Sequence, residues 1–141
     1  MRIIFDPSTV HQSKKGAITG VVYFEFGSDR QFPCTGWNDF VVVLANWWKA
    51  AFQEIIEGQA EVDFRFMDGP FWITAVSQRT NLLLLRCVED RREADGVCET
   101  TVQVDVLERE LRVFARDVSV ACKRAGIKST DLDALRSQLP N

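Results

Sequence analysis

The chain has 141 residues, 46% of them hydrophobic and 26% charged, with a formal net charge of -3. A domain of this length buries about two-thirds of the surface that its unfolded chain exposes, so its core needs no disulfide or metal ion. We expect one domain over residues 1–141. The composition excludes collagen-like, low-complexity and extensively disordered chains. No apolar run approaches the about 20 residues of a membrane span, and residues 1–6 lack a signal-peptide pattern, which predicts a cytoplasmic protein without membrane contact.

The first part of the chain reads as short strands and a loop. Residues 17–26 are rich in β-branched and aromatic side chains and are followed by Gly27, which predicts a strand and a turn. Residues 3–5 predict a shorter strand before it. The single histidine, His11, falls in a polar segment that is typical of an exposed loop.

A long and mostly buried helix follows. Asn38 or Asp39 can accept a hydrogen bond from the free amides of a helix start, and the helix is expected to end at residue 57. Its apolar residues recur at the three-to-four spacing but also fill flanking positions, so the apolar stripe is wider than one face. This pattern places Trp47 and Trp48 in the core.

An antiparallel meander is predicted next, with strands over residues 62–66, 71–76, 81–87 and 100–106. Pro70 lacks the amide that a two-residue turn uses, so we expect a wider connection between the first two strands. The third strand is apolar on both faces, which is typical of a strand covered on both sides.

The register of the meander stays open at this point. With symmetric turns, the face that holds Phe64 and Ile73 also holds Leu84 and then Thr101, which mixes core and polar positions. A bulge or a shifted register reconciles them.

Two helices end the chain. Apolar residues at helical spacing predict a helix over about 105–125, and a short last helix begins at Ser129 or Thr130. The fold class is therefore α+β: an antiparallel β-meander sheet, one long central helix after the N-terminal strands, and two C-terminal helices packed on the sheet.

The cysteines do not form a metal-binding pattern. None of the four has Cys-x-x-Cys spacing, and with one histidine in the chain we expect no structural metal site. Cys87 and Cys98 flank a polar loop symmetrically and face each other if their segments pair as a hairpin. They are either paired or, as we expect in a reducing cytosol, two reduced core residues.

Catalytic motifs are absent from the sequence. It has no Gly-x-Ser-x-Gly, no phosphate-binding loop and no Gly-x-Gly-x-x-Gly. The candidates for acid and base chemistry are His11, Asp63 and Asp68, but His11 reads as a surface residue and Asp68 as a turn residue before a glycine. We expect no enzymatic activity and no cofactor.

A nucleic-acid interface has one argument in its favour. Residues 111–141 carry six basic and three acidic side chains, and residues 123–136 superficially resemble a helix-turn-helix. The second helix of that motif starts with Asp131 and Asp133, whose carboxylates repel phosphates. We therefore expect no direct contact with nucleic acid.

Acidic residues gather in two segments. The loop cluster consists of Glu89, Asp90, Glu93, Asp95 and Glu99. The helix-end cluster consists of Glu54, Glu57, Glu61 and Asp63. Such runs often only keep a protein solvated, but if both clusters lie on one side they form an acidic surface suited to a basic partner.

A family resemblance rests on the pattern Phe-Pro-x-x-Gly-Trp-Asn-Asp-Phe at 32–40, an aliphatic run with Trp47-Trp48, and Phe-Met-Asp-Gly-Pro at 66–70. Over residues 32–72 the chain resembles small bacterial proteins that include immunity proteins of contact-dependent inhibition and other polymorphic toxin systems. The resemblance implies that the protein binds a cognate toxin domain in the cytosol and blocks its active site or substrate path without a cofactor.

These observations predict an immunity protein that neutralises a toxin, for example a basic nuclease, through acidic residues of the two clusters. We expect the contacts at Glu89, Asp90, Glu93, Asp95 and Glu99, with Glu57, Glu61 and Asp63 as a second surface. The main alternative is a small-ligand-binding domain with an aromatic pocket around Trp47, Trp48 and Trp72.

Overall fold

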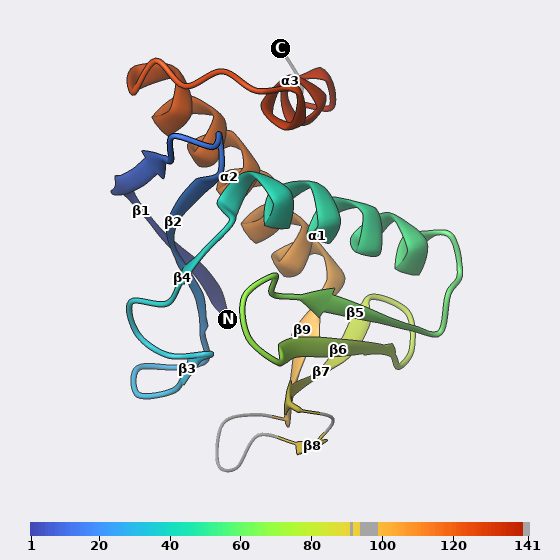
Figure 1. Cartoon of the computed structure of the whole chain (residues 1–141). Coiled ribbons are helices and arrows are strands. Elements are labelled where there is room, and N and C mark those ends of the chain that lie inside the picture. The colour runs from blue at the N-terminus through green and yellow to red at the C-terminus, as the bar shows by residue number, and fades with distance from the viewer. Residues whose placement is uncertain (91, 94–98, 140–141) are drawn as a thin grey trace.

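The computed structural model describes residues 1–90, 92–93 and 99–139, with the backbone alone at 92–93. Strands come first, then a helix, then more strands and two helices (Figure 1). The fold is α+β, as the sequence predicts, and its strands form two antiparallel sheets with the helices packed between and beside them. None of the helices in these ranges combines the length and apolar composition that a membrane span requires.

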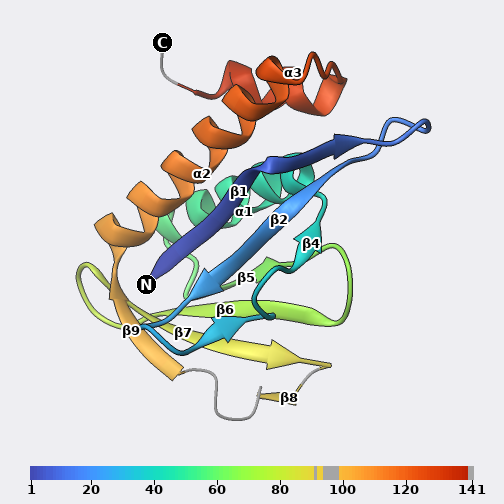
Figure 2. The same ribbon diagram turned by 90° about the vertical axis from the view of Figure 1, so that its left-hand side faces the viewer.

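The first sheet contains the four N-terminal strands. They are β1 (Arg2–Gln12), β2 (Ile18–Glu25), β3 (Gln31–Phe32) and β4 (Asn38–Asp39). β2 pairs with β1 on one side and with β3 and β4 on the other, and Figure 2 faces this sheet. β1 is longer than predicted and includes His11, which is exposed and pairs with Thr19, so the loop prediction there is wrong. The pairing shifts register between Asp6 and His11, at an edge strand that tolerates Pro7.

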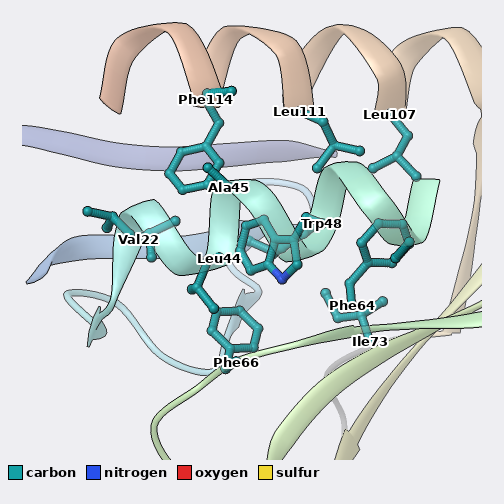
Figure 3. Packing of buried hydrophobic residues seen from close by; sticks show 14 of the residues in the cluster. Val22, Leu44, Ala45, Trp48, Phe64, Phe66, Ile73, Leu107, Leu111 and Phe114 are labelled. Carbon is teal, nitrogen blue, oxygen red and sulfur yellow. The ribbon is translucent and has the colours of Figure 1, made fainter. Parts of the chain in front are cut away.

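Helix α1 (Val41–Ile56) occupies the centre of the molecule. Trp48 is fully buried. The centroid of its ring lies 5.3 Å from that of Phe66, in the loop after residues 61–65, and 5.3 Å from that of Phe114, in the helix over residues 104–124 (Figure 3). Trp47, its neighbour, is 44% exposed, so the prediction of a core position holds for Trp48 and is wrong for Trp47. The helix presents one wide face to the core and leaves the adjacent position in solvent.

The second sheet follows α1. Its strands are β5 (Glu61–Arg65), β6 (Phe71–Ser77), β7 (Leu82–Glu89), β8 (Arg92–Glu93) and β9 (Glu99–Gln103). The strands β5, β6 and β7 pair in order, and β7 also pairs with β8 and β9. A five-residue connection, 66–70, joins β5 to β6, which confirms the wider turn. Val104 and Val106, predicted in the last strand, begin the next helix instead.

The register of the second sheet separates core from surface without a bulge. Ile73 pairs with Phe64 on one side and with Cys87 on the other, whereas Leu84 lies on the opposite face. The symmetric-turn expectation is wrong because residues 79–81 form a three-residue loop, which shifts the pairing. Asn81 closes this loop at φ 66, the left-handed conformation that such loops use.

Two helices complete the fold, α2 (Val104–Arg124) and α3 (Thr130–Ser137). The side chain of Ser129 accepts a hydrogen bond from the Leu132 amide at 3.0 Å, so Ser129 is the cap of α3. In Figure 3, α1 lies between α2 and the second sheet, and side chains from all three interlock.

The cysteines differ in state. Cys34 is exposed and Cys122 is buried, and both are free. Cys87 is fully buried and disulfide-bonded, so the expectation of a reduced thiol is wrong there. Cys98 lies outside the described residues.

Candidate protein-binding surface

Two of the three segments that carry the family resemblance, residues 32–40 and 66–70, meet at the buried carboxylate of Asp39, which is 1% exposed. Asp39 accepts hydrogen bonds from the Trp37 indole (2.9 Å), the Phe40 amide (2.7 Å) and the Asp68 amide (3.1 Å). Asp39 thus accepts a hydrogen bond from an amide at the start of α1, as predicted, but the N-cap itself is Phe40, which has no side-chain cap. Three neutral donors hold this carboxylate, which makes it a structural group that ties two loops together.

Aromatic packing reinforces this junction. The Trp37 ring contacts the Phe71 ring at 5.1 Å, and Gly69 passes beneath both. A Cβ at Gly69 meets the Phe71 ring at 2.9 Å, and the residue has φ +74, so only glycine fits this position. We call these five residues, Trp37, Asp39, Asp68, Gly69 and Phe71, the Asp39 junction.

The aromatic pocket that the sequence offered as an alternative does not form. Trp48 is buried and donates to the Arg65 carbonyl at 2.7 Å, Trp47 projects from the exposed side of α1, and Trp72 lies on the outer side of the second sheet. The three indoles therefore do not converge on one cavity.

The outer side of the second sheet is a broad accessible surface. Buried and more accessible residues alternate along β5, β6 and β7, and no helix of the described chain lies on the side away from α1 (Figures 1 and 2). We define the open face as the residues that share this outer side, which are Glu61, Asp63, Arg65, Trp72, Thr74, Val76, Leu82, Leu84, Arg86, Val88, Glu99, Thr101 and Gln103.

A polar row crosses the middle of the open face. Asp63, Thr74, Arg86 and Glu99 are aligned across four strands. The Thr74 hydroxyl donates to Asp63 at 2.8 Å, and Arg86 Nε donates to Glu99 at 3.0 Å. Arg65 also bonds Asp63 at 3.3 Å and lies 4.9 Å above the Trp72 ring. Both arginines of the open face are therefore already bound to its own acids.

Apolar side chains lie on both sides of this row. Trp72 pairs with Val88 on one side, and Val76 pairs with Leu84 on the other, next to Leu82. All five are half-buried and none belongs to the hydrophobic core. The prediction that the third meander strand is covered on both sides is wrong within the described structure, because Leu82 and Leu84 face outward.

The predicted acidic residues are partly brought together. Glu61 and Asp63 of the helix-end cluster share the open face with Glu99 of the loop cluster. Glu57 is exposed just after α1 and accepts a bond from Gln53 at 3.1 Å.

The rest of the loop cluster lies at the end of β7 or beyond. Glu89 and Asp90 are exposed there, and the Asp90 amide donates to the Pro70 carbonyl at 2.8 Å. Glu93 lies in β8, where its backbone pairs with Val88, and its side chain is not described. Asp95 lies outside the described residues. The two predicted surfaces thus overlap on one sheet face without merging into a purely acidic patch.

A groove between α1 and α2 is the second candidate site. It has a volume of about 370 Å³, and Phe52, Ile56, Leu111 and Leu139 form its apolar lining. Its two cations are engaged, since Lys49 Nζ donates to the Gln138 carbonyl at 2.7 Å and Arg112 bonds Glu108 at 3.4 Å. The groove can hold an apolar ligand, and the Lys49 ammonium, bonded to a neutral carbonyl, is the charge in its lining that has no acidic partner among the described residues.

Sites for metal chemistry or nucleic acid find little support in the described residues. Within them no three His, Cys, Asp or Glu side chains gather closely enough to hold a metal ion. At the α2–α3 corner, Arg136 is bound to the Ser119 hydroxyl at 3.0 Å and to its carbonyl at 3.2 Å. Asp131 and Asp133 are exposed in the first turn of α3, which opposes phosphate binding.

Comparison of the chain with protein-family models gave no match, and neither did searches of curated proteins and of solved structures. The resemblance over residues 32–72 thus stays a prediction. Its residues form the Asp39 junction, which is a feature of the scaffold.

Proposed function

We propose that this protein is an immunity-type inhibitor that binds a cognate bacterial toxin domain through the open face and neutralises it. The observation that carries the proposal is the gathering of Glu61, Asp63 and Glu99 with five apolar side chains on one uncovered sheet face. A broad face of mixed polarity suits a protein surface better than a small molecule, which needs a concave pocket.

The charge balance supports a basic partner. Arg65 and Arg86 are paired within the face, whereas Glu61 has no ion pair among the described residues. Glu57 and Glu89 are exposed acids outside the face, just after α1 and at the end of β7. A toxin nuclease carries positive charge toward its nucleic-acid substrate, so an acidic inhibitor is steered toward its active site. Inhibition then follows from covering the active site or substrate path, with no catalysis and no cofactor of its own.

The cytosol is the proposed meeting place, because a nuclease reaches its substrate there. A disulfide at Cys87 is unusual in that compartment. Cell fractionation decides the point: recovery in the cytosolic fraction supports a toxin that acts inside the cell, and recovery in an oxidising compartment contradicts this location.

The direct test uses the gene beside that of this protein. If the neighbour encodes a large secreted protein with a variable C-terminal domain, that domain is co-expressed with this chain. We expect rescue of growth and a one-to-one complex in size-exclusion chromatography. A toxic domain that still kills, and that elutes separately from folded inhibitor, contradicts the proposal.

Charge reversal tests the acidic contribution. Glu61→Lys with Glu89→Lys should slow association and weaken its dependence on salt, because exposed charges act mainly on encounter. The matched control reverses Asp117 of α2 and Asp133 of α3, two exposed acids that belong neither to the open face nor to the lining of the α1–α2 groove. Equal association rates and salt slopes in both variants contradict a role of Glu61 and Glu89.

A second candidate function is storage or sensing of an apolar small molecule, which the α1–α2 groove favours. Native mass spectrometry of the purified protein checks it. A bound apolar compound, lost in Ile56→Arg at an exposed position of the lining, supports this function, and an unliganded mass argues against it.

A further inference from the structure

We infer that the apolar rows of the open face, rather than its charges, provide most of the affinity for the protein partner. The partner meets these rows with an apolar surface that is flanked by lysine or arginine side chains. This inference rests on the proposed function and adds which residues hold the toxin domain and what chemistry that domain presents.

Strand β7 is apolar on both of its faces. Leu83 and Leu85 of β7 are 1% exposed and fill the core, so the fold accounts for them. Leu82 and Leu84 alternate with these residues, point outward and lie outside the core cluster. The sheet itself half-buries both side chains, and a partner that covers their remaining apolar surface gains free energy from its removal from water.

The apolar side chains of the open face are arranged in rows. Leu84 pairs with Val76, and Trp72 pairs with Val88, so the side chains form rows across neighbouring strands instead of isolated spots. Tryptophan is the residue type most often responsible for large losses in protein interfaces. Trp72 is held under the Arg65 guanidinium at 4.9 Å, which restricts its ring before a partner arrives.

The acids of the polar row already have partners within the open face. Asp63 is bound by Thr74 and Arg65, and Glu99 is bound by Arg86. A basic residue of the partner has to compete with these bonds, so each new ion pair adds little net affinity. The polar row therefore sets the orientation of the partner, and the apolar rows set the strength of binding.

The charge of the open face distinguishes between a second copy of this chain and a different protein as its partner. Among the described residues of the open face, a second copy of this chain brings the same unpaired acid, Glu61, and no unpaired base to meet it. Like charges oppose such a dimer, whereas a basic domain complements them. Charge complementarity thus favours a different protein over self-association.

The test measures the dissociation constant of the neighbour-encoded toxin domain with the full-length chain and three variants. Leu84→Asp lies in one apolar row and Trp72→Ala in the other. The matched control is Ile56→Asp, because Ile56 is 52% exposed and lines the α1–α2 groove instead. We expect about 100-fold weaker binding for Leu84→Asp and at least about 10-fold for Trp72→Ala, mainly through faster dissociation. Ile56→Asp should stay within about threefold of the wild type.

The outcomes separate the two proposals. If the folded wild type does not bind the domain, the proposed function is overturned. If the wild type binds and both open-face variants bind equally well, the function stands and this inference is overturned. Loss of binding in Ile56→Asp alone assigns the interface to the α1–α2 groove, and it likewise overturns the inference that the apolar rows hold the partner. If circular dichroism shows that Leu84→Asp is unfolded, Trp72→Ala decides. A wild-type dimer in sedimentation that Leu84→Asp converts to monomer identifies a second copy as the occupant, against the inference.

Discussion

The Asp39 junction and the open face both combine a tryptophan with a carboxylate, yet they do opposite things with them. In the junction, Asp39 is 1% exposed and receives three hydrogen bonds, one of them from Trp37. On the open face, Asp63 is bonded at the surface, and Trp72 is half-buried beneath an arginine. The junction satisfies the Asp39 carboxylate internally, whereas the open face keeps part of its apolar side chains accessible to another molecule.

Stability and recognition depend on different regions of the molecule. A buried carboxylate costs free energy unless its hydrogen bonds are complete, so a substitution in the junction lowers the free energy of unfolding. An exposed ion pair is screened and weak, so a change in the open face leaves the fold intact. Mutations in the two regions should therefore differ in their effect on the free energy of unfolding.

The largest effect is expected in the junction. Asp39→Ala leaves the Trp37 indole and the amides of Phe40 and Asp68 without their partner, and it should lower the free energy of unfolding by about 3–5 kcal/mol. Urea denaturation followed by circular dichroism measures it.

Asp68→Ala is the matched control for this variant. The Asp68 side chain is exposed, and its amide, which the substitution keeps, makes the bond to Asp39. We expect a change within about 0.5 kcal/mol. If Asp39→Ala is as mild as its control, the junction is not the stabilising centre described here.

The second effect compares two adjacent leucines of β7. Leu83 is 1% exposed in the core, so Leu83→Ala should lower the free energy of unfolding by about 2–4 kcal/mol. Leu84 lies on the open face, where Leu84→Ala should cost less than about 1 kcal/mol. Thermal and urea unfolding of the pair measure the contrast, and equal losses contradict an uncovered outer face.

Much of this architecture follows from local pattern. The helix predicted over 105–125 is observed at Val104–Arg124, and Ser129 is one of the two caps proposed for the last helix. These features depend on side-chain periodicity and short-range hydrogen bonds, which the sequence displays directly. The α+β class follows from the order of such elements.

Features that depend on tertiary context were not predictable in the same way. Val104 and Val106 continue the alternation of a strand, yet they begin α2, because local pattern does not fix where a strand gives way to a helix. The three-residue loop at 79–81 shifted the register of β7, and the left-handed Asn81 gives only a weak sequence signal for it.

The candidate site shows the same division. The acids of both clusters were recognised from composition, but their partners Arg65, Thr74 and Arg86 became visible only through the cross-strand register. The available signal was the strand with two apolar faces. It predicted a covered outer face, and the uncovered face in the described structure is what directs attention to a partner.

A smaller change in the free energy of unfolding is expected at alkaline pH, where the Cys122 thiol titrates. Burial raises the pKa of the Cys122 thiol, and nearby Arg136 lowers it less. The folded state therefore keeps its proton at pH values where the unfolded thiol, with a pKa of about 8.5, has lost it. This contribution to stability is complete below the unfolded pKa and is lost as the pH rises toward the folded pKa.

Urea unfolding of the wild type and Cys122→Ala from about pH 7 to 10 tests this sign. The wild type should lose more stability with rising pH than the variant does. Cys34→Ala, at an exposed free cysteine, is the control and should keep the wild-type slope. Parallel slopes for wild type and Cys122→Ala contradict the effect.

The smallest effect is expected for the ion pair between Arg86 and Glu99 on the open face. Their side chains are 46% and 47% exposed, so the coupling energy from Arg86→Ala, Glu99→Ala and the double variant should be about 0.5 kcal/mol or less. It should fall further in about 1 M salt, where the Debye length is about 3 Å. A coupling above about 2 kcal/mol that resists salt would mean that the polar row stabilises the fold as the junction does. The comparison would then fail, because the two regions would no longer divide stability from recognition.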